Sequence, residues 1–409
     1  MSPRAAAQNA QPLGTGLKPP RDIVVVGGGV AAHRCAVELR ALGFDGQIVM
    51  VSGEARLPYD RTLLSKDMLA VDPLDEPISI VKPERYGQLG IDVRLESRAE
   101  WLDTAERRVG LSDRSTLHYD RLILCVGGKP VVPPELDAPG VLVLREARHV
   151  GALREALNHS QSMVIIGGGF IGGEVAAAAR AHGVAVTLIE AASQPLEQVV
   201  GAEIGERVAT LHRQNEVELV LGKGAKAVTV SGSGYQVLLQ DGSVIMADSV
   251  VVGVGMRPNT DWLAKSGVAL DRGIVTDASC RTSVPGILAA GDCARWWHPR
   301  YGGLCRVEHW DTANRHGVAV ASTALGAELQ FAPIPFFWSD QYGVKLQWAG
   351  YAPKWDRLVI EGEGARNFVA RYVRHGSLVA VLSAGQPRLF AALRRELEAP
   401  TTVKETSAV

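Results

Sequence analysis

The sequence predicts an α/β protein that contains two Rossmann-like βαβ units and ends in an α+β segment. Two stretches predict the units: "IVVVGGGVAAHRCAVEL" (23–39) and "MVIIGGGFIGGEVAAAA" (163–179) each pass from an apolar strand through a glycine turn into a helix. Near the end of the chain, four strand-like stretches precede the amphipathic "PRLFAALRRELE" (387–398); they are "VKLQWAG", "RLVIEG", "NFVARYV" and "SLVAVLSAG". Strands followed by a helix are typical of an α+β domain.

The composition is that of a globular protein, with 46% apolar residues, 21% charged residues and a formal net charge of -1. A chain of 409 residues predicts two or three domains. A charge near zero is not typical of nucleic-acid-binding domains, and no apolar run approaches the ~20 residues of a membrane span. We therefore expect neither a nucleic-acid partner nor a membrane partner. Residues 1–21 lack an apolar signal segment and are predicted to be a flexible leader.

The cysteines form no CxxC or CxxxxC pair; they are Cys35, Cys125, Cys280, Cys293 and Cys305. An odd number of cysteines in a chain without a signal segment indicates reduced thiols and a cytoplasmic location. No metal site is predicted.

The first glycine turn has the pattern Gly27-x-Gly29-x-x-Ala32. The first glycine permits a tight turn, the second leaves space for a pyrophosphate, and the small third residue lets helix and strand pack closely. The amides of Val30 and Ala31 open the helix, where they would face the anion. Because the strand-like "QIVMVS" follows at βαβ spacing, we interpret the turn as a dinucleotide site.

The second turn repeats this pattern with Gly167, Gly169 and Gly172, and Phe170 and Ile171 open its helix. Two such turns in one chain imply two dinucleotides, and hydride transfer between them is the expected use. The alternative is a duplicated domain in which one site is inactive.

Glu190 ends the strand-like "AVTLIE", 18 residues after Gly172. An acidic residue there suits the two hydroxyls of an adenosine ribose and repels a 2′-phosphate. The following "EAASQPLEQ" contains no arginine or lysine, which favours NADH over NADPH. In the first unit, Gly53 stands where this acid is often found and Glu54 follows it. Either Glu54 serves the ribose or that contact is missing.

Four further stretches follow the pattern of one known family; they are "LPYDRTLLSKDML" (57–69), "YDRLILCVGGKP" (119–130), "TSVPGILAAGDCARW" (282–296) and "PFFWSDQYGVKLQWAGY" (335–351). With them, the chain resembles the FAD-containing, NADH-dependent ferredoxin reductases of bacterial oxygenase systems from about residue 22 to 390. Their fold is similar to that of glutathione reductase. The chain departs from the family at Thr62 and Leu63, where two prolines are usual, and at Phe336, where a tryptophan is common.

The resemblance implies roles for individual residues. Besides the first turn and Glu54, the residues expected to contact non-covalently bound FAD are Arg61, Lys66, Ala99, Gly127, Arg145, Gly291, Asp292, Trp310 and Trp338. The expected NAD contacts are Gly167, Gly169, Phe170, Ile171, Gly172, Glu174, Glu190 and Gly255. Asp292 offers a carboxylate to the hydroxyls of the flavin's ribityl chain, and the bare backbone of Gly291 permits close approach.

The resemblance also implies the domain order. An FAD-binding domain, 22–124 and 257–330, is interrupted by an NAD-binding domain, 125–256, and an α+β domain occupies 331–409.

Glu174 is an unexpected carboxylate among the small residues of the second helix. One interpretation places it in the first helical turn on a solvated face, where it favours the positive end of the helix dipole. The resemblance implies a different role, in which Glu174 pairs with Lys66 beside the reactive edge of the flavin. A buried ammonium requires such a partner. Lys66 and Glu174 are therefore the predicted catalytic residues.

The absence of a dithiol in the predicted flavin-side stretch predicts how electrons leave. NADH gives a hydride, and without a disulfide to receive two electrons the flavin is expected to pass single electrons to a [2Fe-2S] ferredoxin. The resemblance implies that this ferredoxin feeds a cytochrome P450 or a ring-hydroxylating dioxygenase. The alternatives are a rubredoxin reductase, an NADH oxidase, or an NADH-responsive binding protein like apoptosis-inducing factor.

A basic stretch, "ARWWHPRYGGLCRVEHWDTANRHG" (294–317), is the predicted docking site for the ferredoxin, because small ferredoxins are typically acidic. Its arginines are Arg295, Arg300, Arg306 and Arg315. The alternative is that these arginines form ion pairs within the chain. A monomer or a weak dimer is expected.

Overall fold

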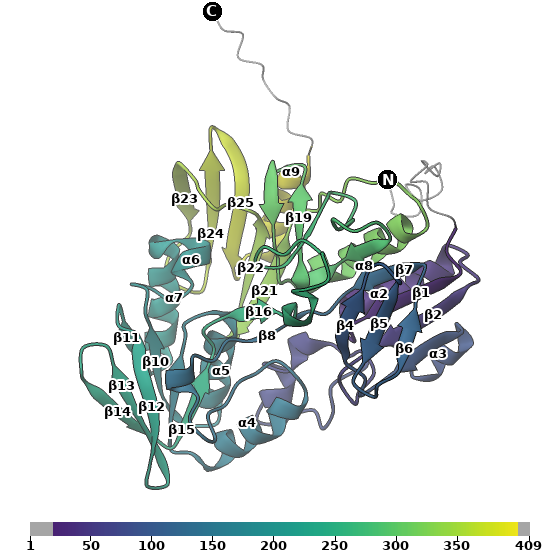
Figure 1. The fold of residues 1–409 in the computed structure, drawn as a ribbon. Helices are drawn as coiled ribbons and strands as arrows, with labels where there is room; N and C mark the ends of the chain where they lie inside the picture. The colour runs from purple at the N-terminus through teal and green to yellow at the C-terminus, as the bar shows by residue number, and fades with distance from the viewer. Residues whose placement is uncertain (1–18, 400–409) are drawn as a thin grey trace, which may run out of the picture.

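The computed structural model describes residues 19–399. The leader predicted at 1–21 therefore lies almost entirely outside the described residues. In the described part, seven sheets and their helices form two similar parallel-sheet units and a C-terminal antiparallel sheet (Figure 1).

The first unit is built on a five-stranded parallel sheet in the order β18-β7-β1-β2-β3. Its strands are β1 (Asp22–Val26), β2 (Gln47–Val51), β3 (Ile91–Arg94), β7 (Arg121–Leu124) and β18 (Ile287–Ala289). Side chains alternate across β1, so Ile23 and Val25 enter the core on one face while Val24 and Val26 enter the core on the other. Burial on both faces explains why this strand is a continuous apolar run.

Helices and a small sheet cover the first unit. They are α2 (Val30–Ala41), α3 (Glu84–Gln88) and α8 (Trp310–Ala324), with the antiparallel strands β4 (Ala99–Asp103), β5 (Arg108–Leu111) and β6 (Thr116–His118). Helix α8 packs along α2 although 268 residues separate their ends (Figure 1). The segment after β18 thus belongs to the same core as the first strand.

The second unit repeats this architecture with a parallel sheet in the order β11-β10-β9-β15. Its strands are β9 (Ser162–Ile166), β10 (Ala185–Glu190), β11 (Val217–Leu221) and β15 (Ser249–Val252), and its helices are α4 (Arg148–His159), α5 (Phe170–Ala181), α6 (Glu197–Val200) and α7 (Ala202–Gln214). An antiparallel sheet of β12 (Ala225–Ser231), β13 (Gly234–Leu239) and β14 (Val244–Ala247) is inserted before β15, as β4–β6 are inserted before β7.

In both parallel sheets, the strand order reverses beside the strand that enters the glycine turn. Strand β1 lies between β2 and β7, and β9 lies between β10 and β15. Ligands of open parallel sheets bind at the carboxyl ends of the strands at such a reversal. Both glycine turns therefore lie at a reversal of strand order, which is where the topology predicts a ligand to bind.

Short elements connect the units. Two strands, β8 (Gly128–Pro130) and β16 (Met256–Pro258), pair with each other at the entry to and the exit from the second unit, and β17 (Ile274–Thr276), β19 (Ala294–His298) and β20 (Gly303–Cys305) form a three-stranded sheet. The single-turn helices are η1 (Arg61–Leu63), η2 (Asp67–Leu69), η3 (Pro134–Leu136), η4 (Asp261–Leu263) and η5 (Gly291–Cys293).

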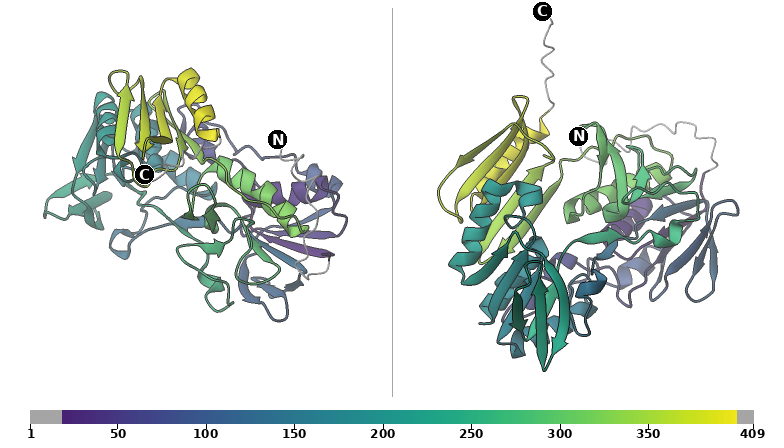
Figure 2. Two further views of the ribbon diagram at one scale, coloured as in Figure 1. Left: turned by 90° about the horizontal axis from the view of Figure 1, so that it is seen from above. Right: turned by 60° about the vertical axis from the view of Figure 1, so that its left-hand side comes forward.

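The C-terminal sheet has the order β21-β22-β25-β24-β23 and is antiparallel throughout. Its elements are β21 (Phe336–Gln341), β22 (Val344–Gly350), β23 (Arg357–Glu361), β24 (Phe368–Arg374), β25 (Ser377–Ala384) and the helix α9 (Pro387–Glu398). One face packs against the region of α6 and α7, and α9 covers the other (Figure 2). The four strands and the helix predicted after residue 343 are all present.

The predicted fold class, two Rossmann-like domains with an α+β C-terminal domain, is confirmed by these sheets. All five cysteines lie among the described residues, and each is free and buried. Among residues 19–399, no helix combines the length and the apolar character that crossing a bilayer would need.

Candidate functional site

The first cavity, of about 600 Å³, opens at the carboxyl ends of β1, β2, β7 and β18. Of the residues predicted to contact FAD, those that line it are Gly27, Gly29, Val30, Ala31, Glu54, Arg61, Lys66, Ala99, Gly127, Arg145, Gly291, Asp292, Trp310 and Trp338. Ala32 does not line it, because it is fully buried in the contact between α2 and the sheet. The structure thus brings together residues that are up to 311 positions apart.

The glycine turn of the first unit leaves room for a phosphate. Gly27 has a φ of +141°, and a Cβ there would lie 2.1 Å from the carbonyl oxygen of Cys125, so only glycine fits. A Cβ at Gly29 would meet no atom within 4 Å and would instead project into open space at the cavity wall. The residues present therefore fit a pyrophosphate at the N-terminus of α2.

Glu54 lines the first cavity, but its carboxylate already has two partners in the chain. The Tyr59 hydroxyl donates to Glu54 Oε2 at 2.7 Å, and the Arg61 guanidinium donates to Oε1. A Cβ at Gly53 would lie 2.8 Å from Cγ of Arg98, and Arg98 also lines the cavity. A role for Glu54 at the FAD ribose stays a prediction, and Arg98 is a cavity residue that the sequence reasoning missed.

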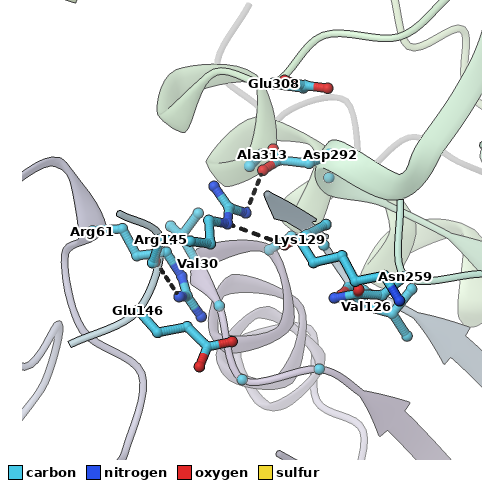
Figure 3. A pocket seen from close by; sticks show the side chains of 18 of the residues that line it. Val30, Arg61, Val126, Lys129, Arg145, Glu146, Asn259, Asp292, Glu308 and Ala313 are labelled. Atoms are coloured by element: carbon cyan, nitrogen blue, oxygen red, sulfur yellow. Dashed lines mark hydrogen bonds and ion pairs between the residues drawn. The ribbon is translucent and has the colours of Figure 1, made fainter. Parts of the chain in front are cut away.

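Arg145 crosses the first cavity toward Asp292, as Figure 3 shows. Its Nη2 donates to Asp292 Oδ2 at 2.9 Å, and its Nε donates to the carbonyl of Gly128 at 3.2 Å. Arg61 donates to the backbone oxygen of Arg145 at 2.9 Å. These contacts hold the Arg145 guanidinium beside the predicted ribityl-binding carboxylate and join Arg61 to the backbone of Arg145.

Two ring nitrogens in the wall of the first cavity have no hydrogen-bond partner. Trp310 Nε1 and His309 Nδ1 are both buried and have no partner among residues 19–399. Buried polar atoms are normally satisfied, so these two fit a polar molecule bound in the cavity. Burial lowers the pKa of His309 to about 4, so its ring is neutral at pH 7.

The second cavity, of about 690 Å³, opens at the carboxyl ends of β9, β10 and β15. The predicted NAD contacts that line it are Gly167, Gly169, Phe170, Ile171, Glu190 and Gly255. Gly172 does not, because it packs against the turn: a Cβ there would lie 2.0 Å from the oxygen of Gly167. Glu174 lines the first cavity instead.

The second glycine turn has the same geometry as the first. Gly167 has a φ of +110° and its Cβ would lie 2.4 Å from the oxygen of Gly253, whereas a Cβ at Gly169 would meet nothing within 4 Å. Glu190 reaches back to this turn, where its Oε2 accepts from the amide of Gly168 at 2.7 Å. Its Oε1 accepts from the amide of Ala192 at 2.8 Å. The carboxylate is thereby fixed in the wall of the second cavity.

The two cavities adjoin each other. The residues that line both are Arg61, Ser65, Arg145, Phe170, Ile171 and Glu308. The two cavities are therefore immediate neighbours.

The structure places Lys66 and Glu174 in contact, and a catalytic role for the pair stays a prediction. Lys66 Nζ lies 2.8 Å from Oε1 and 2.9 Å from Oε2 of Glu174. The alternative interpretation was wrong: α5 begins at Phe170, so Glu174 is in its second turn rather than its first, and it is 3% exposed rather than solvated.

Sequence reasoning missed two serines that bind Glu174. The Ser65 hydroxyl donates to Oε2, and the Ser339 hydroxyl donates to Oε1 at 2.6 Å. The position of Ser65 directly before Lys66 was a usable signal. Ser339 is 165 residues from Glu174, and no local pattern could have indicated the contact.

One cysteine, Cys125, lines the first cavity, at the end of β7. Burial raises the pKa of its thiol well above the ordinary value, so it is protonated and unreactive at pH 7. In the part of the chain that the structure describes, no other cysteine lines either cavity, and none is in a disulfide.

The four arginines of the predicted docking stretch all have partners within the chain. Arg295 pairs with Asp271 and Arg306 with Glu308, while Arg315 Nε lies 2.9 Å from Asp311 Oδ2. Arg300 donates to the carbonyl of Leu397 at 2.6 Å, at the end of α9. Three of the four therefore form the ion pairs that the alternative expected, whereas Arg300 contacts backbone carbonyls. Docking at these residues stays a prediction.

Comparisons with known proteins cover almost the whole chain. The family model "Pyridine nucleotide-disulphide oxidoreductase" matches residues 21–317, and the model "Reductase C-terminal" matches residues 336–409. Rhodocoxin reductase of Rhodococcus erythropolis is 35% identical over 94% of this chain and 92% of its own. The ferredoxin–NAD(+) reductase component of the anthranilate 1,2-dioxygenase system of Burkholderia cepacia is 35% identical over 92% of this chain and 94% of its own.

The fold is also similar to that of a reductase captured with its partner. The crystal structure of the covalent putidaredoxin reductase–putidaredoxin complex superimposes with a TM-score of 0.88 at 30% identity, over 93% of each chain.

Proposed function

The chain belongs to the pyridine nucleotide-disulphide oxidoreductase family, and from this premise we propose that it is a FAD-dependent NADH:ferredoxin oxidoreductase. Family membership implies binding of FAD and NAD(P)H. FAD, bound without a covalent link, occupies the first cavity and NADH the second. Residues 22–124 and 257–330 form the FAD-binding domain, 125–256 the NAD-binding domain and 331–409 the C-terminal domain.

One observation carries the proposal: the two cavities share a wall and contain no disulfide. A shared wall lets two bound dinucleotides meet, as hydride transfer requires. When bound, FAD supplies the chemistry by which two electrons that arrive together as a hydride leave one at a time. Without a dithiol that could receive both electrons, the acceptor is a protein that takes one electron at a time.

The residues of the chain orient the two ligands and place charge around them. The amides at the N-termini of α2 and α5 bind the pyrophosphates, and Asp292 accepts hydrogen bonds from ribityl hydroxyls. Glu190 binds the adenosine ribose of NADH. Lys66, held by Glu174, places a positive charge at the edge of the first cavity where negative charge develops.

The partner is a [2Fe-2S] ferredoxin that feeds a cytochrome P450 or a ring-hydroxylating dioxygenase. This is supported by relatives whose names describe reductases of a dioxygenase system and of putidaredoxin. The location is cytoplasmic, because the five thiols are reduced.

Anaerobic and aerobic NADH turnover with a panel of purified [2Fe-2S] ferredoxins tests this function. We expect NADH oxidation to be slow alone and to rise at least about tenfold when a ferredoxin and cytochrome c are added, because the ferredoxin is the acceptor. Fast oxygen consumption without ferredoxin would instead identify an NADH oxidase. Turnover with rubredoxin alone would identify a rubredoxin reductase, and a long-lived complex with NADH but little turnover would identify a binding protein.

Replacement of Arg295 and Arg300 by glutamate tests the docking stretch. We expect the KM for the ferredoxin to rise about tenfold at low ionic strength, because acidic residues would repel an acidic partner. Ferricyanide reduction, which needs no docking, should not change. A comparable loss in both assays would show that the substitutions disturb the fold through Asp271 or the end of α9 rather than the docking of the ferredoxin.

A further inference from the structure

We infer that Ser339, a residue of the C-terminal sheet, is a positioning residue for the Lys66–Glu174 pair, so that the C-terminal domain helps to hold the charge beside the flavin site. The inference rests on the proposed function, because it concerns the step in which NADH reduces bound FAD. The feature that carries it is the set of hydrogen bonds around one buried carboxylate.

Glu174 is 3% exposed, and all its hydrogen-bond donors come from other segments. Its Oε1 accepts from Lys66 Nζ at 2.8 Å, from the Ser339 hydroxyl at 2.6 Å and from the amide of Asp340 at 3.3 Å. Its Oε2 accepts from Lys66 Nζ at 2.9 Å and from the Ser65 hydroxyl. A buried carboxylate with a donor on each lone-pair side is held in one orientation.

Each proposed domain contributes to this cluster. Ser65 and Lys66 lie in the loop between η1 and η2, Glu174 lies on α5, and Ser339 lies on β21. Strand β21 packs directly on α5. It approaches closely because residue 173 is glycine: a Cβ there would lie 2.7 Å from the side-chain amide of Gln341.

The hydroxyl of Ser339 has a defined direction. Gln341 Nε2 donates to Ser339 Oγ at 3.2 Å, so the serine oxygen acts as acceptor on one side and as donor to Glu174 on the other. Ser339 is 0% exposed and Gln341 is 1% exposed, so water does not compete for these bonds. The order of donation is Gln341 to Ser339 to Glu174, and a chain of this kind fixes the carboxylate more firmly than a single bond.

The position of Glu174 decides the position of Lys66. Two of the three N–H groups of Nζ point to the two carboxylate oxygens, which leaves the third for the first cavity that Lys66 lines. If Oε1 loses the serine donor, the buried carboxylate has fewer hydrogen-bond donors, and its interaction with the Lys66 ammonium becomes stronger. Lys66 would then present less of its charge to the cavity.

The test compares three variants as holoenzymes: S339A, S339T, which keeps the hydroxyl, and the control S383A. Ser383 is a 0% exposed serine of β25 in the same sheet, and its hydroxyl has no hydrogen-bond partner among the described residues. Flavin reduction by NADH is followed anaerobically by stopped flow, and the midpoint potential of bound FAD is measured by equilibration with dyes.

We expect S339A to slow flavin reduction about tenfold and to make the midpoint potential more negative, because less positive charge faces the reduced flavin. S339T and S383A should retain the wild-type values. Equal rates and potentials for S339A and S383A would overturn the inference.

If S339A does not fold, S65A removes the donor to the other carboxylate oxygen from a different segment. The same slower reduction and lower potential are expected, and wild-type values would overturn the inference. A wild-type protein that NADH does not reduce at all would instead contradict the proposed function, so the two failures are distinguishable.

Discussion

Replacement of Lys66 by methionine is expected to slow the reduction of bound FAD by NADH about 100-fold, the usual effect of removing one electrostatic stabiliser from an active site. Methionine retains the length of the side chain but removes the charge that faces the first cavity. It also leaves Glu174 buried without its cation, with only the two serines and one amide as donors. FAD affinity should fall with the reduction rate, and both are measured by stopped flow and by titration of the apoprotein with FAD.

Two further variants test whether the effect comes from the charge at this site, rather than from the loss of any one lysine or from a less stable protein. Lys354→Met removes an exposed lysine of the C-terminal domain and should leave the rate and FAD affinity unchanged. Glu174→Ala removes the carboxylate that holds Lys66, so it should slow flavin reduction at least as much as S339A does. It should also weaken NADH binding, since α5 forms a wall of the second cavity through Phe170 and Ile171. Wild-type reduction rates in both Lys66→Met and Glu174→Ala would contradict a role for the pair.

Replacement of Glu190 by arginine is expected to lower the ratio of kcat/KM for NADH to that for NADPH by about 100-fold, which corresponds to about 2.7 kcal/mol. The carboxylate lies in the wall of the second cavity and would repel a 2′-phosphate, whereas a guanidinium would pair with it. Steady-state kinetics with both nucleotides, measured with ferricyanide as acceptor, gives the ratio without any need for a ferredoxin.

Because Glu190 also accepts from the amides of Gly168 and Ala192, arginine would remove one bond to the glycine turn and one bond to the loop after β10. Glu190→Gln retains an acceptor without the charge, and we expect about a tenfold lower ratio from it. Glu218→Arg is the control, because this exposed carboxylate lies on the neighbouring strand β11. If the control lowered the ratio as much as Glu190→Arg, general surface charge rather than the ribose contact would determine the preference.

Local patterns predicted the parts of the site that lie in one segment. The two glycine turns and the acid at the end of β10 were identified because each requires particular residue types at fixed spacing. Gly291 and Asp292, which follow β18, were identified from the family resemblance. The pair of Lys66 and Glu174 could be predicted only from the family resemblance. No rule of spacing connects residues that are 108 positions apart.

Other features depended on which neighbours the fold supplies. Because Glu54 follows Gly53, the sequence left two alternatives, that Glu54 serves the ribose or that the contact is missing. It had no means of indicating that Arg61 and Tyr59 bind the Glu54 carboxylate. The sequence likewise did not show which carboxylates bind the two arginines. Arg295 pairs with Asp271, 24 positions away, and Arg306 pairs with Glu308, two positions away. Exposure of a charged residue cannot be inferred from its type when an opposite charge lies nearby.

By itself, the sequence determined that this chain contains two glycine turns of the dinucleotide-binding pattern and no CxxC or CxxxxC pair, because both are properties of short segments. Only the tertiary structure decided that the two cavities share a wall and that Ser65, Glu174 and Ser339 meet at one carboxylate. The physical reason is that a buried carboxylate must collect donors from whatever segments the packing places within about 3 Å of it, and those segments need not be close in the sequence.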